Sequence, residues 1–357
     1  MTVATPPRRA RSRELAIETS ALRKTYRSRK GRHVAVEGLD LQVPRGGVHG
    51  FLGPNGSGKT TTIRMLLGLI TADSGQMSVF DRPVPASLPE VVGSIGAIVE
   101  APKFSPTLSG RRNLELLATG IGTPRSRVSE VLGEVGLLGR DRDAFRKYSL
   151  GMKQRLAIAG TLLKDPDLLI FDEPTNGLDP AGIHEIRATM RGLAERGKTV
   201  LVSSHILSEV QQVADTVSII GRGRLLAQGD VEEILAAPGG QVVRVGVADP
   251  GRAAAVLTPA GFAVKPLPEN RLEVRRSDQQ PGFDPAQVTW LLAQQGLFVF
   301  ELTPVKADLE SVFLDLTADE HLGATGHGPA AAPPPPGASP PGGSAVGPSR
   351  AAKENWR

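Results

Sequence analysis

A glycine-rich segment that ends in a lysine and two threonines carries the strongest chemical signal in this sequence. It follows the apolar run 48–52 and precedes a helical pattern. Glycines permit a turn whose backbone N–H groups point at phosphate oxygens, and the following helix N-terminus adds a favourable dipole. We expect Lys59 to reach the β- and γ-phosphates of a nucleotide and the Thr60 hydroxyl to ligate Mg²⁺. The predicted nucleotide-binding residues here are Gly53, Pro54, Asn55, Gly56, Ser57, Gly58, Lys59, Thr60 and Thr61.

Two carboxylates stand together at the end of an apolar run. Residues 168–171 are Leu-Leu-Ile-Phe, which predicts a strand buried on both faces, and Asp172 and Glu173 follow. Open α/β sheets place their sites at the carboxyl ends of such strands. We expect Asp172 to hold Mg²⁺ through water and Glu173 to polarise an attacking water. With the glycine-rich segment, these residues predict a nucleoside triphosphatase without naming its family.

The segment just before this strand narrows the family. It reads Tyr148-Ser149-Leu150-Gly151-Met152-Lys153-Gln154-Arg155. It resembles the signature motif of ATP-binding cassettes, whose usual form is Leu-Ser-Gly-Gly-Gln. Ser149 and Gly151 match that form. The departures are Tyr148, Leu150 and Met152. Since Ser149 stands where a predicted helix begins, its hydroxyl and the helix N-terminus can meet an anion.

The rest of the cassette pattern follows in order, and the resemblance covers residues 14–237. Asp179 stands where the family has its D-loop. His205, which follows two serines at a strand end, resembles the family's switch histidine. Tyr26 resembles the aromatic residue that stacks on adenine. The resemblance therefore implies a catalytic set of Glu173, His205 and Lys59 that acts on ATP with Mg²⁺.

Glu100 stands where the family usually has the glutamine of the Q-loop. A glutamine offers a neutral carbonyl and an amide donor, whereas Glu100 adds a full negative charge and has no N–H₂ group. That charge repels phosphates unless a cation is close. We expect Glu100 to turn away from the site, paired with a basic residue, and to contact Mg²⁺ only when a partner docks. The alternative is that Glu100 replaces glutamine as a weak metal contact.

The resemblance also implies how such a chain works. The phosphate loop of one subunit and the signature of another would sandwich one ATP, with Ser149, Leu150, Gly151 and Met152 as the contacts in trans. One chain carries one copy of each motif, which fits a homodimer. Three segments, 148–155, 203–210 and 308–316, are similar to the bacterial bacitracin- and daunorubicin-resistance branch. There the ATPase pairs with a separate membrane permease at the cytoplasmic face of a bacterial membrane and exports a drug, antibiotic or lipid-like compound.

The order of predicted elements indicates an α/β fold. The resemblance implies a P-loop cassette with a RecA-like core, an antiparallel β edge and a helical signature subdomain. The predicted strands are 33–43, 47–52, 94–99, 167–172, 198–203, 216–221 and 223–228. The predicted helices are 59–69, 109–119, 126–136, 149–164, 181–196 and 205–214.

The remaining segments divide into an accessory domain and two tails. Residues 241–303 show the order βαββαβ of a ferredoxin-like unit, and 308–317 predict a helix, so 241–318 is expected to be a small α+β domain. The basic segment 1–13 and the Ala-, Gly- and Pro-rich segment 322–357 are expected to be disordered.

Composition excludes several classes of function. The chain has 357 residues, no cysteine and a formal charge of +5. Disulfides and thiolate metal sites are therefore excluded. No apolar stretch reaches the roughly 20 residues that a membrane span needs, so another chain must form any transport path. A basic arm can touch nucleic acid or anionic lipid, but no aromatic residues lie among the arginines of 8–13, and no nucleic-acid partner is expected.

Three alternatives stay open on the sequence alone. The first is a soluble cassette ATPase that acts on ribosomes or nucleic acid, although those in translation typically carry two cassettes in one chain. The second is an importer ATPase, whose C-terminal domain is often an all-β barrel, against which the two helices predicted within 241–303 argue. The third is a regulator that binds nucleotide without hydrolysis, which would be expected to lack Glu173 or His205.

Overall fold

The computed structural model describes residues 14–28, 31–100, 103–236, 242–276, 284–305 and 308–322. The predicted tails, 1–13 and 322–357, lie outside these residues except for Leu322. Residues up to Thr317 belong to one compact unit. In the described part of the chain, no helix has the length and apolar character to cross a membrane.

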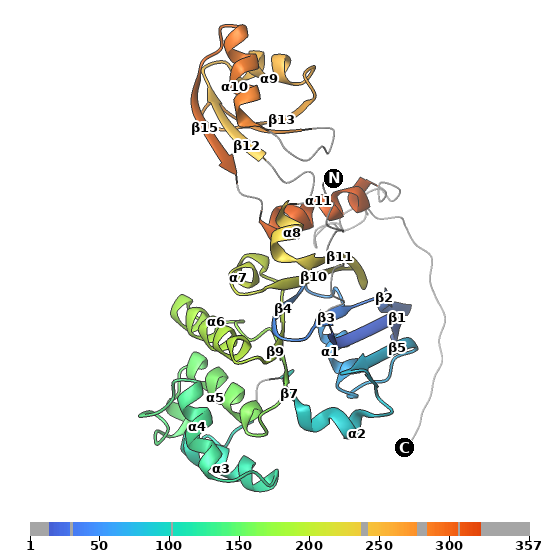
Figure 1. Ribbon diagram of the computed structural model, residues 1–357, viewed down its shortest axis with the longest axis vertical. Coiled ribbons are helices and arrows are strands. Elements are labelled where there is room, and N and C mark those ends of the chain that lie inside the picture. The colour runs from blue at the N-terminus through green and yellow to red at the C-terminus, as the bar shows by residue number, and fades with distance from the viewer. Residues whose placement is uncertain are drawn as a thin grey trace, which may run out of the picture. The chain divides into compact units, whose positions relative to one another are not determined.

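A six-stranded sheet forms the centre of the cassette (Figure 1), in the order β11-β10-β4-β9-β8-β7. The neighbours from β10 to β7 are parallel, and β11 is antiparallel to β10. Because β4, β8 and β9 are neighbours, the segments that follow them meet at one edge of the sheet. The strand bounds are β4 Gly47–Leu52, β7 Ile95–Ile98, β8 Leu168–Asp172, β9 Thr199–Ser204, β10 Thr216–Gly221 and β11 Arg224–Asp230.

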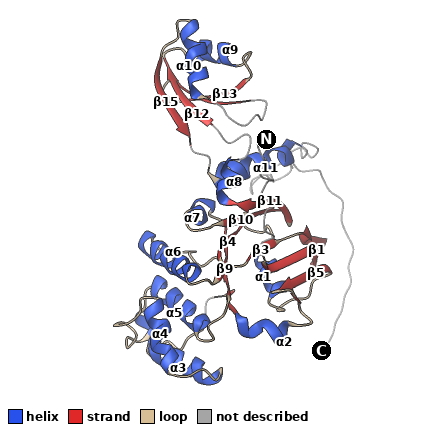
Figure 2. Ribbon diagram, viewed as in Figure 1, coloured by secondary structure: helices blue, strands red, loops and turns tan. Residues whose placement is uncertain are grey.

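A second, antiparallel sheet was only partly predicted from the sequence. Its path is β2-β1-β5-β6, with β3 paired to β1. Figure 2 labels β1, β3 and β5 of this sheet. The long strand β1 was not among the predicted strands, because register shifts and the positive φ of Ala21 (48°) break its apolar alternation. The predicted strand 33–43 is two strands. The bounds are β1 Leu15–Ser28, β2 Gly31–Leu39, β3 Gln42–Pro44, β5 Ser74–Val79 and β6 Arg82–Pro83.

Most of the predicted helices are present within two or three residues of their predicted bounds. The exception is 205–214, where the helix is only Leu207–Gln211. The Ser204 hydroxyl accepts a hydrogen bond from Ile206 N at 2.9 Å and keeps the preceding residues out of the helix. The helix bounds are α1 Lys59–Leu66, α2 Leu88–Val91, α3 Gly110–Gly120, α4 Ser126–Glu134, α5 Leu150–Leu162, α6 Pro180–Glu195, α7 Leu207–Gln211 and α8 Val231–Ala236.

Two apolar clusters pack against the two faces of the central sheet. Leu114, Val131 and Leu156 of α3, α4 and α5 join one cluster with Val200 of β9. The other cluster packs α1 and the antiparallel sheet against the opposite side, where Leu201 points. Successive residues of a buried strand face opposite sides, so a strand that is apolar throughout serves both clusters.

The C-terminal segment forms a four-stranded antiparallel sheet with two helices, and its element order is βαββαβ. The strand order is β13-β14-β12-β15. A third apolar cluster, which includes Val245, Leu257 and Leu292, joins the sheet to the helices. This is a small α+β unit; its boundaries with the cassette stay a prediction. The bounds are β12 Val242–Val247, α9 Pro250–Leu257, β13 Phe262–Leu267, β14 Arg271–Arg276, α10 Pro285–Gln294 and β15 Val299–Val305.

A last helix, α11 (Leu309–Leu322), starts within the cassette's own apolar cluster. Leu309 is fully buried there, Val312 and Phe313 pack against it, and Leu309 N donates to Gln211 Oε1 at 2.9 Å. The apolar spacing of 308–317 therefore serves core packing, which is the usual role of such a stripe.

Candidate functional site

A cavity of about 230 Å³ lies over the glycine-rich segment. Gly58 precedes α1 with φ of +107°, and a Cβ atom there would lie 2.5 Å from the Ala35 carbonyl oxygen. Only glycine therefore lets this segment pass so close to β2. The lining residues are Tyr26, His33, Ala35, Asn55, Gly56, Gly58, Lys59, Thr60, Thr61 and Glu173.

Lys59, the first residue of α1, is held by the loop that it belongs to. Its Nζ donates to the carbonyl oxygens of Gly53 at 2.6 Å and Pro54 at 3.3 Å, and lies 3.3 Å from Glu173 Oε1. The Lys59 side chain is only 5% exposed. A cation in this position provides a fixed positive charge for an anion that enters the cavity.

The two strand-end carboxylates face different partners. Thr60 Oγ1 donates to Asp172 Oδ2 at 2.7 Å, and the Ser203 hydroxyl donates to Asp172 Oδ1. Asp172 does not itself line the cavity and reaches its edge through Thr60. A hydroxyl beside a carboxylate is an oxygen-only donor set, which is what Mg²⁺ prefers.

Glu173 lies between a lysine and a histidine. His205 Nδ1 hydrogen-bonds to Glu173 Oε2 at 2.7 Å, and Lys59 lies on the other oxygen. Glu173 has φ of +50°, a left-handed backbone that costs a non-glycine residue on the order of 1–3 kcal/mol. Its backbone N donates to both Ser203 O (3.3 Å) and Ser203 Oγ (3.0 Å). His205 contacts Glu173 without lining the cavity.

Comparison with known proteins decides the family. The family model described as ABC transporter matches residues 36–176. The bacitracin transport ATP-binding protein BcrA of Bacillus licheniformis is 49% identical over 214 residues, which are 59% of this chain and 69% of that protein. The daunorubicin resistance ATP-binding protein DrrA3 of Streptomyces coeruleorubidus is 34% identical over 313 residues, 86% of this chain and 97% of that protein. This chain belongs to the ABC transporter ATP-binding proteins.

A solved structure agrees with the assignment. The cbiO1 protein of Clostridium perfringens, part of the ABC transporter complex cbiONQ, shows 28% sequence identity and a TM-score of 0.57. The match covers 62% of this chain and 91% of that structure. The cassette fold predicted from the sequence is confirmed. As a member of this family, the chain is an ATPase whose cassette binds ATP.

The signature segment of this cassette begins α5, away from the cavity. Ser149 is the N-cap, and its Oγ accepts from Met152 N at 3.2 Å. None of 149–152 lines the cavity. Leu150 is 53% exposed, whereas Tyr148 is 4% exposed and its hydroxyl donates to Arg140 O at 2.9 Å. The Tyr148 departure therefore belongs to the core, and the Leu150 departure lies on the surface.

The D-loop aspartate has a clear local role in this cassette. Asp179 is the N-cap of α6, and its Oδ1 accepts from Gly182 N at 3.1 Å. Gly151 of the signature packs near Gly182, since a Cβ atom at Gly151 would lie 3.6 Å from Gly182 Cα. The D-loop and the signature thus support each other within one chain. Their contact with a nucleotide stays a prediction.

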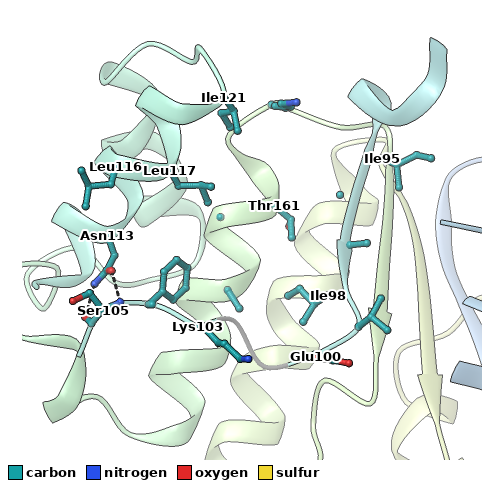
Figure 3. A pocket seen from close by; sticks show the side chains of 17 residues that line it. Ile95, Ile98, Glu100, Lys103, Ser105, Asn113, Leu116, Leu117, Ile121 and Thr161 are labelled. Carbon is teal, nitrogen blue, oxygen red and sulfur yellow. Dashed lines mark hydrogen bonds between the residues drawn. The ribbon is translucent and has the colours of Figure 1, made fainter. Parts of the chain in front are cut away.

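Glu100, the Q-loop position, lies outside the nucleotide cavity. Its Oε1 is 3.2 Å from Arg64 Nη2, and its side chain is 75% exposed. Arg64 is therefore the basic partner that the sequence led us to expect, although any role of Glu100 toward Mg²⁺ stays a prediction. Glu100 instead borders a second cavity of about 660 Å³ (Figure 3), whose lining includes Leu116 and Leu117 of α3.

Three residues at the site were not predicted from the sequence, and Ala35, which lines the cavity, is one of them. His33 lines the cavity and pairs directly with Tyr26 across β1 and β2. Ser203 contacts both Asp172 and Glu173. His33 could have been found from its position opposite Tyr26 on the neighbouring strand, but the strand that carries Tyr26, β1, had not been predicted. The signal for Ser203 was its position two residues before His205, at the end of a buried strand.

Proposed function

We propose that this chain is the ATP-hydrolysing subunit of an exporter, and that it drives a membrane permease formed by another chain. The export of a drug, antibiotic or lipid-like compound is supported by the names of the relatives, which act in bacitracin transport and daunorubicin resistance. The observation that carries the proposal is that Glu173, which lines the cavity together with Lys59, contacts both Lys59 and His205.

The working unit is a homodimer. The signature residues 149–152 do not line the nucleotide cavity of their own chain. One chain therefore provides the phosphate loop for a nucleotide but not a signature segment on the nucleotide's other side. A second copy, related by a two-fold axis in an isologous dimer, supplies Ser149 and the N-terminus of α5 to the same nucleotide. ATP then favours the closed dimer because its γ-phosphate contacts both halves.

The residues at the strand end fit Mg²⁺. Thr60 Oγ1 and Asp172 Oδ2 provide hydroxyl and carboxylate oxygens 2.7 Å apart, beside the lysine that faces the phosphates. When bound, the ion neutralises phosphate charge and polarises the phosphoryl oxygens. Thr60 and Asp172 would hold it. Glu100 would join them only after release from Arg64.

This chain's own residues account for the hydrolytic step. Glu173 Oε1 or Oε2 polarises the attacking water, and His205 Nδ1 holds the carboxylate in place. The Lys59 ammonium offsets charge on the phosphate oxygens, and the loop carbonyls of Gly53 and Pro54 keep that ammonium in position. Water attacks the γ-phosphorus and gives a proton to the Glu173 carboxylate, the bond to the β–γ bridging oxygen breaks, and ADP and phosphate leave as Glu173 passes the proton on to solvent.

The second cavity supports a permease contact. Leu116 and Leu117 are 49% and 38% exposed and line it together with Phe104 and Ile121. A hollow of this size, with apolar side chains beside polar and charged ones, suits an amphipathic short helix from a partner chain. Glu100 lies at the rim of this cavity, so a partner that docks there can disturb the ion pair between Glu100 and Arg64. The subunit would then be peripheral, at the cytoplasmic face of a bacterial membrane.

Two other functions receive less support. An importer ATPase with an all-β C-terminal barrel does not match α9 and α10, which cover the C-terminal sheet. A soluble cassette acting on ribosomes or nucleic acid has no support from the names of the relatives, which are transport and resistance proteins.

The proposal is tested by reading the neighbouring genes for a membrane permease and expressing any such chain together with this one. We expect co-purification of the two chains, and ATP-dependent uptake of bacitracin- or anthracycline-like compounds into inverted membrane vesicles. Vesicles that carry Glu173→Gln provide the matched control and should show no uptake. Full ATPase activity without any associated membrane chain, together with ATP-dependent binding to ribosomes, would favour the soluble alternative.

A further inference from the structure

Ser203 is a fully buried serine at the centre of the hydrolytic residues. It lies on β9, where it is paired with Asp172 of β8 on one side and Phe51 of β4 on the other. Its hydroxyl donates a hydrogen bond to Asp172 Oδ1, and the hydroxyl oxygen accepts a hydrogen bond from the Glu173 backbone N–H at 3.0 Å. Both hydrogen bonds are made to residues of the proposed site.

The two contacts act on different features. The bond to Asp172 Oδ1 fixes the carboxylate so that its other oxygen, Oδ2, faces Thr60 at 2.7 Å. The bond from Glu173 N fixes a backbone with φ of +50°, which L-residues other than glycine rarely adopt. With that backbone, the Glu173 carboxylate lies between Lys59 and His205.

We propose that Ser203 is a positioning residue for ATP hydrolysis, which sets the Asp172 carboxylate and the Glu173 backbone with a single hydroxyl. It does not touch the nucleotide cavity itself. This inference rests on the proposed hydrolytic roles of Asp172 and Glu173. Removal of the hydroxyl leaves Asp172 with one fewer donor and Glu173 N with only the longer bond, 3.3 Å, to Ser203 O.

The chain offers a matched control in Ser218. It is also fully buried in the same sheet, on β10, and its hydroxyl makes hydrogen bonds to Gln228 and His49. Ser218→Ala removes the same group from the same kind of environment without contact to Asp172 or Glu173. Any general effect of a lost buried hydroxyl is therefore common to both variants.

The experiment compares Ser203→Ala, Ser203→Thr and Ser218→Ala in the full chain. We measure kcat and KM for ATP, thermal midpoints, and Mn²⁺ affinity by electron paramagnetic resonance with a non-hydrolysable ATP analogue. Residues that orient metal ligands typically change affinity or activity by about 10- to 100-fold when removed. We expect Ser203→Ala to lower kcat and Mn²⁺ affinity within that range, with KM for ATP nearly unchanged. Ser203→Thr should recover kcat, and Ser218→Ala should keep the parent values.

Several results would overturn the proposal. One is parent-like kcat and Mn²⁺ affinity in Ser203→Ala. Another is an equal loss of both in Ser218→Ala, which would show a general effect of the buried hydroxyl. If the extra methyl group prevents Ser203→Thr from folding, Ser203→Ala and Ser218→Ala still decide. Parent-like turnover in Glu173→Gln would instead remove the proposed hydrolytic site, whatever Ser203 does.

Discussion

The imidazole of His205 lies against the carboxylate of Glu173, with 2.7 Å between Nδ1 and Oε2. On its other side the carboxylate has Lys59 Nζ at 3.3 Å. Glu173 is thus held from both sides before any nucleotide enters. This pairing joins the ends of β8 and β9, and the first two predictions depend on it.

Glu173→Gln should abolish turnover and leave ATP binding intact, because the amide keeps the shape but cannot act as a base. With ATP and Mg²⁺ the variant should accumulate as a closed dimer, which light scattering detects. Glu195→Gln, on the exposed part of α6, is the control. A Glu173→Gln protein that stays monomeric and hydrolyses ATP normally would remove Glu173 from the role.

His205→Ala should lower kcat by about 10²- to 10⁴-fold if Glu173 needs its partner for general-base work. The Glu173 carboxylate would then turn toward Lys59, its remaining partner, which we expect to leave ATP affinity nearly unchanged. Steady-state kinetics and nucleotide titration separate the two effects. Loss of ATP binding with unchanged kcat would contradict the assignment.

Tyr26→Ala should weaken ATP binding by about 1–3 kcal/mol, because the 40%-exposed ring borders the cavity and is available to stack on a base. Tyr26→Phe should bind as the parent does. Lys59→Ala should lose most of its affinity for ATP, because the lysine contacts to the phosphates are removed. Fluorescence titration with an ATP analogue measures all three, and parent-like binding by Tyr26→Ala would make Tyr26 a structural residue.

Glu100→Gln should change the ATPase rate of the isolated subunit little, since Glu100 faces Arg64 outside the cavity. Stimulation of ATPase by the permease should change severalfold. The assay compares the variant with and without the permease, and Arg64→Gln tests the same ion pair from its other side. Identical behaviour of variant and parent in both assays would leave Glu100 as a simple replacement for glutamine.

Stability should fall as the pH is lowered below 7, because burial lowers the pKa of His49 to about 3. The folded chain keeps His49 neutral, with its ring nitrogens on Thr216 and Ser218, while the unfolded chain takes up a proton near pH 6.5. Between pH 7 and 5.5 this linkage costs about 1 kcal/mol. Urea unfolding of parent and His49→Gln should show the smaller pH slope in the variant.

The glycine-rich segment and the two strand-end carboxylates were recognised from short motifs in the sequence. The run from Gly53 to Thr61 follows the end of β4, and Asp172 and Glu173 stand at the end of β8. Their order along the chain therefore predicts their local geometry. Ser149 was likewise predicted to stand at a helix start, and its Oγ accepts from the N–H three residues ahead. These predictions needed only local physics.

Contacts between distant residues needed the tertiary structure. Ser203 is 31 residues from Asp172, and the Glu100 partner Arg64 lies 36 residues away. Tyr26 faces His33 only because β1 and β2 pair in that register, and the irregular β1 gave no alternating pattern to reveal it. The sequence by itself thus determined the family, and it predicted which groups do the chemistry. The strand order and register, which only the tertiary structure shows, decided which side chains hydrogen-bond to these groups. Residues on neighbouring strands become partners through strand pairing, which their spacing along the chain does not predict.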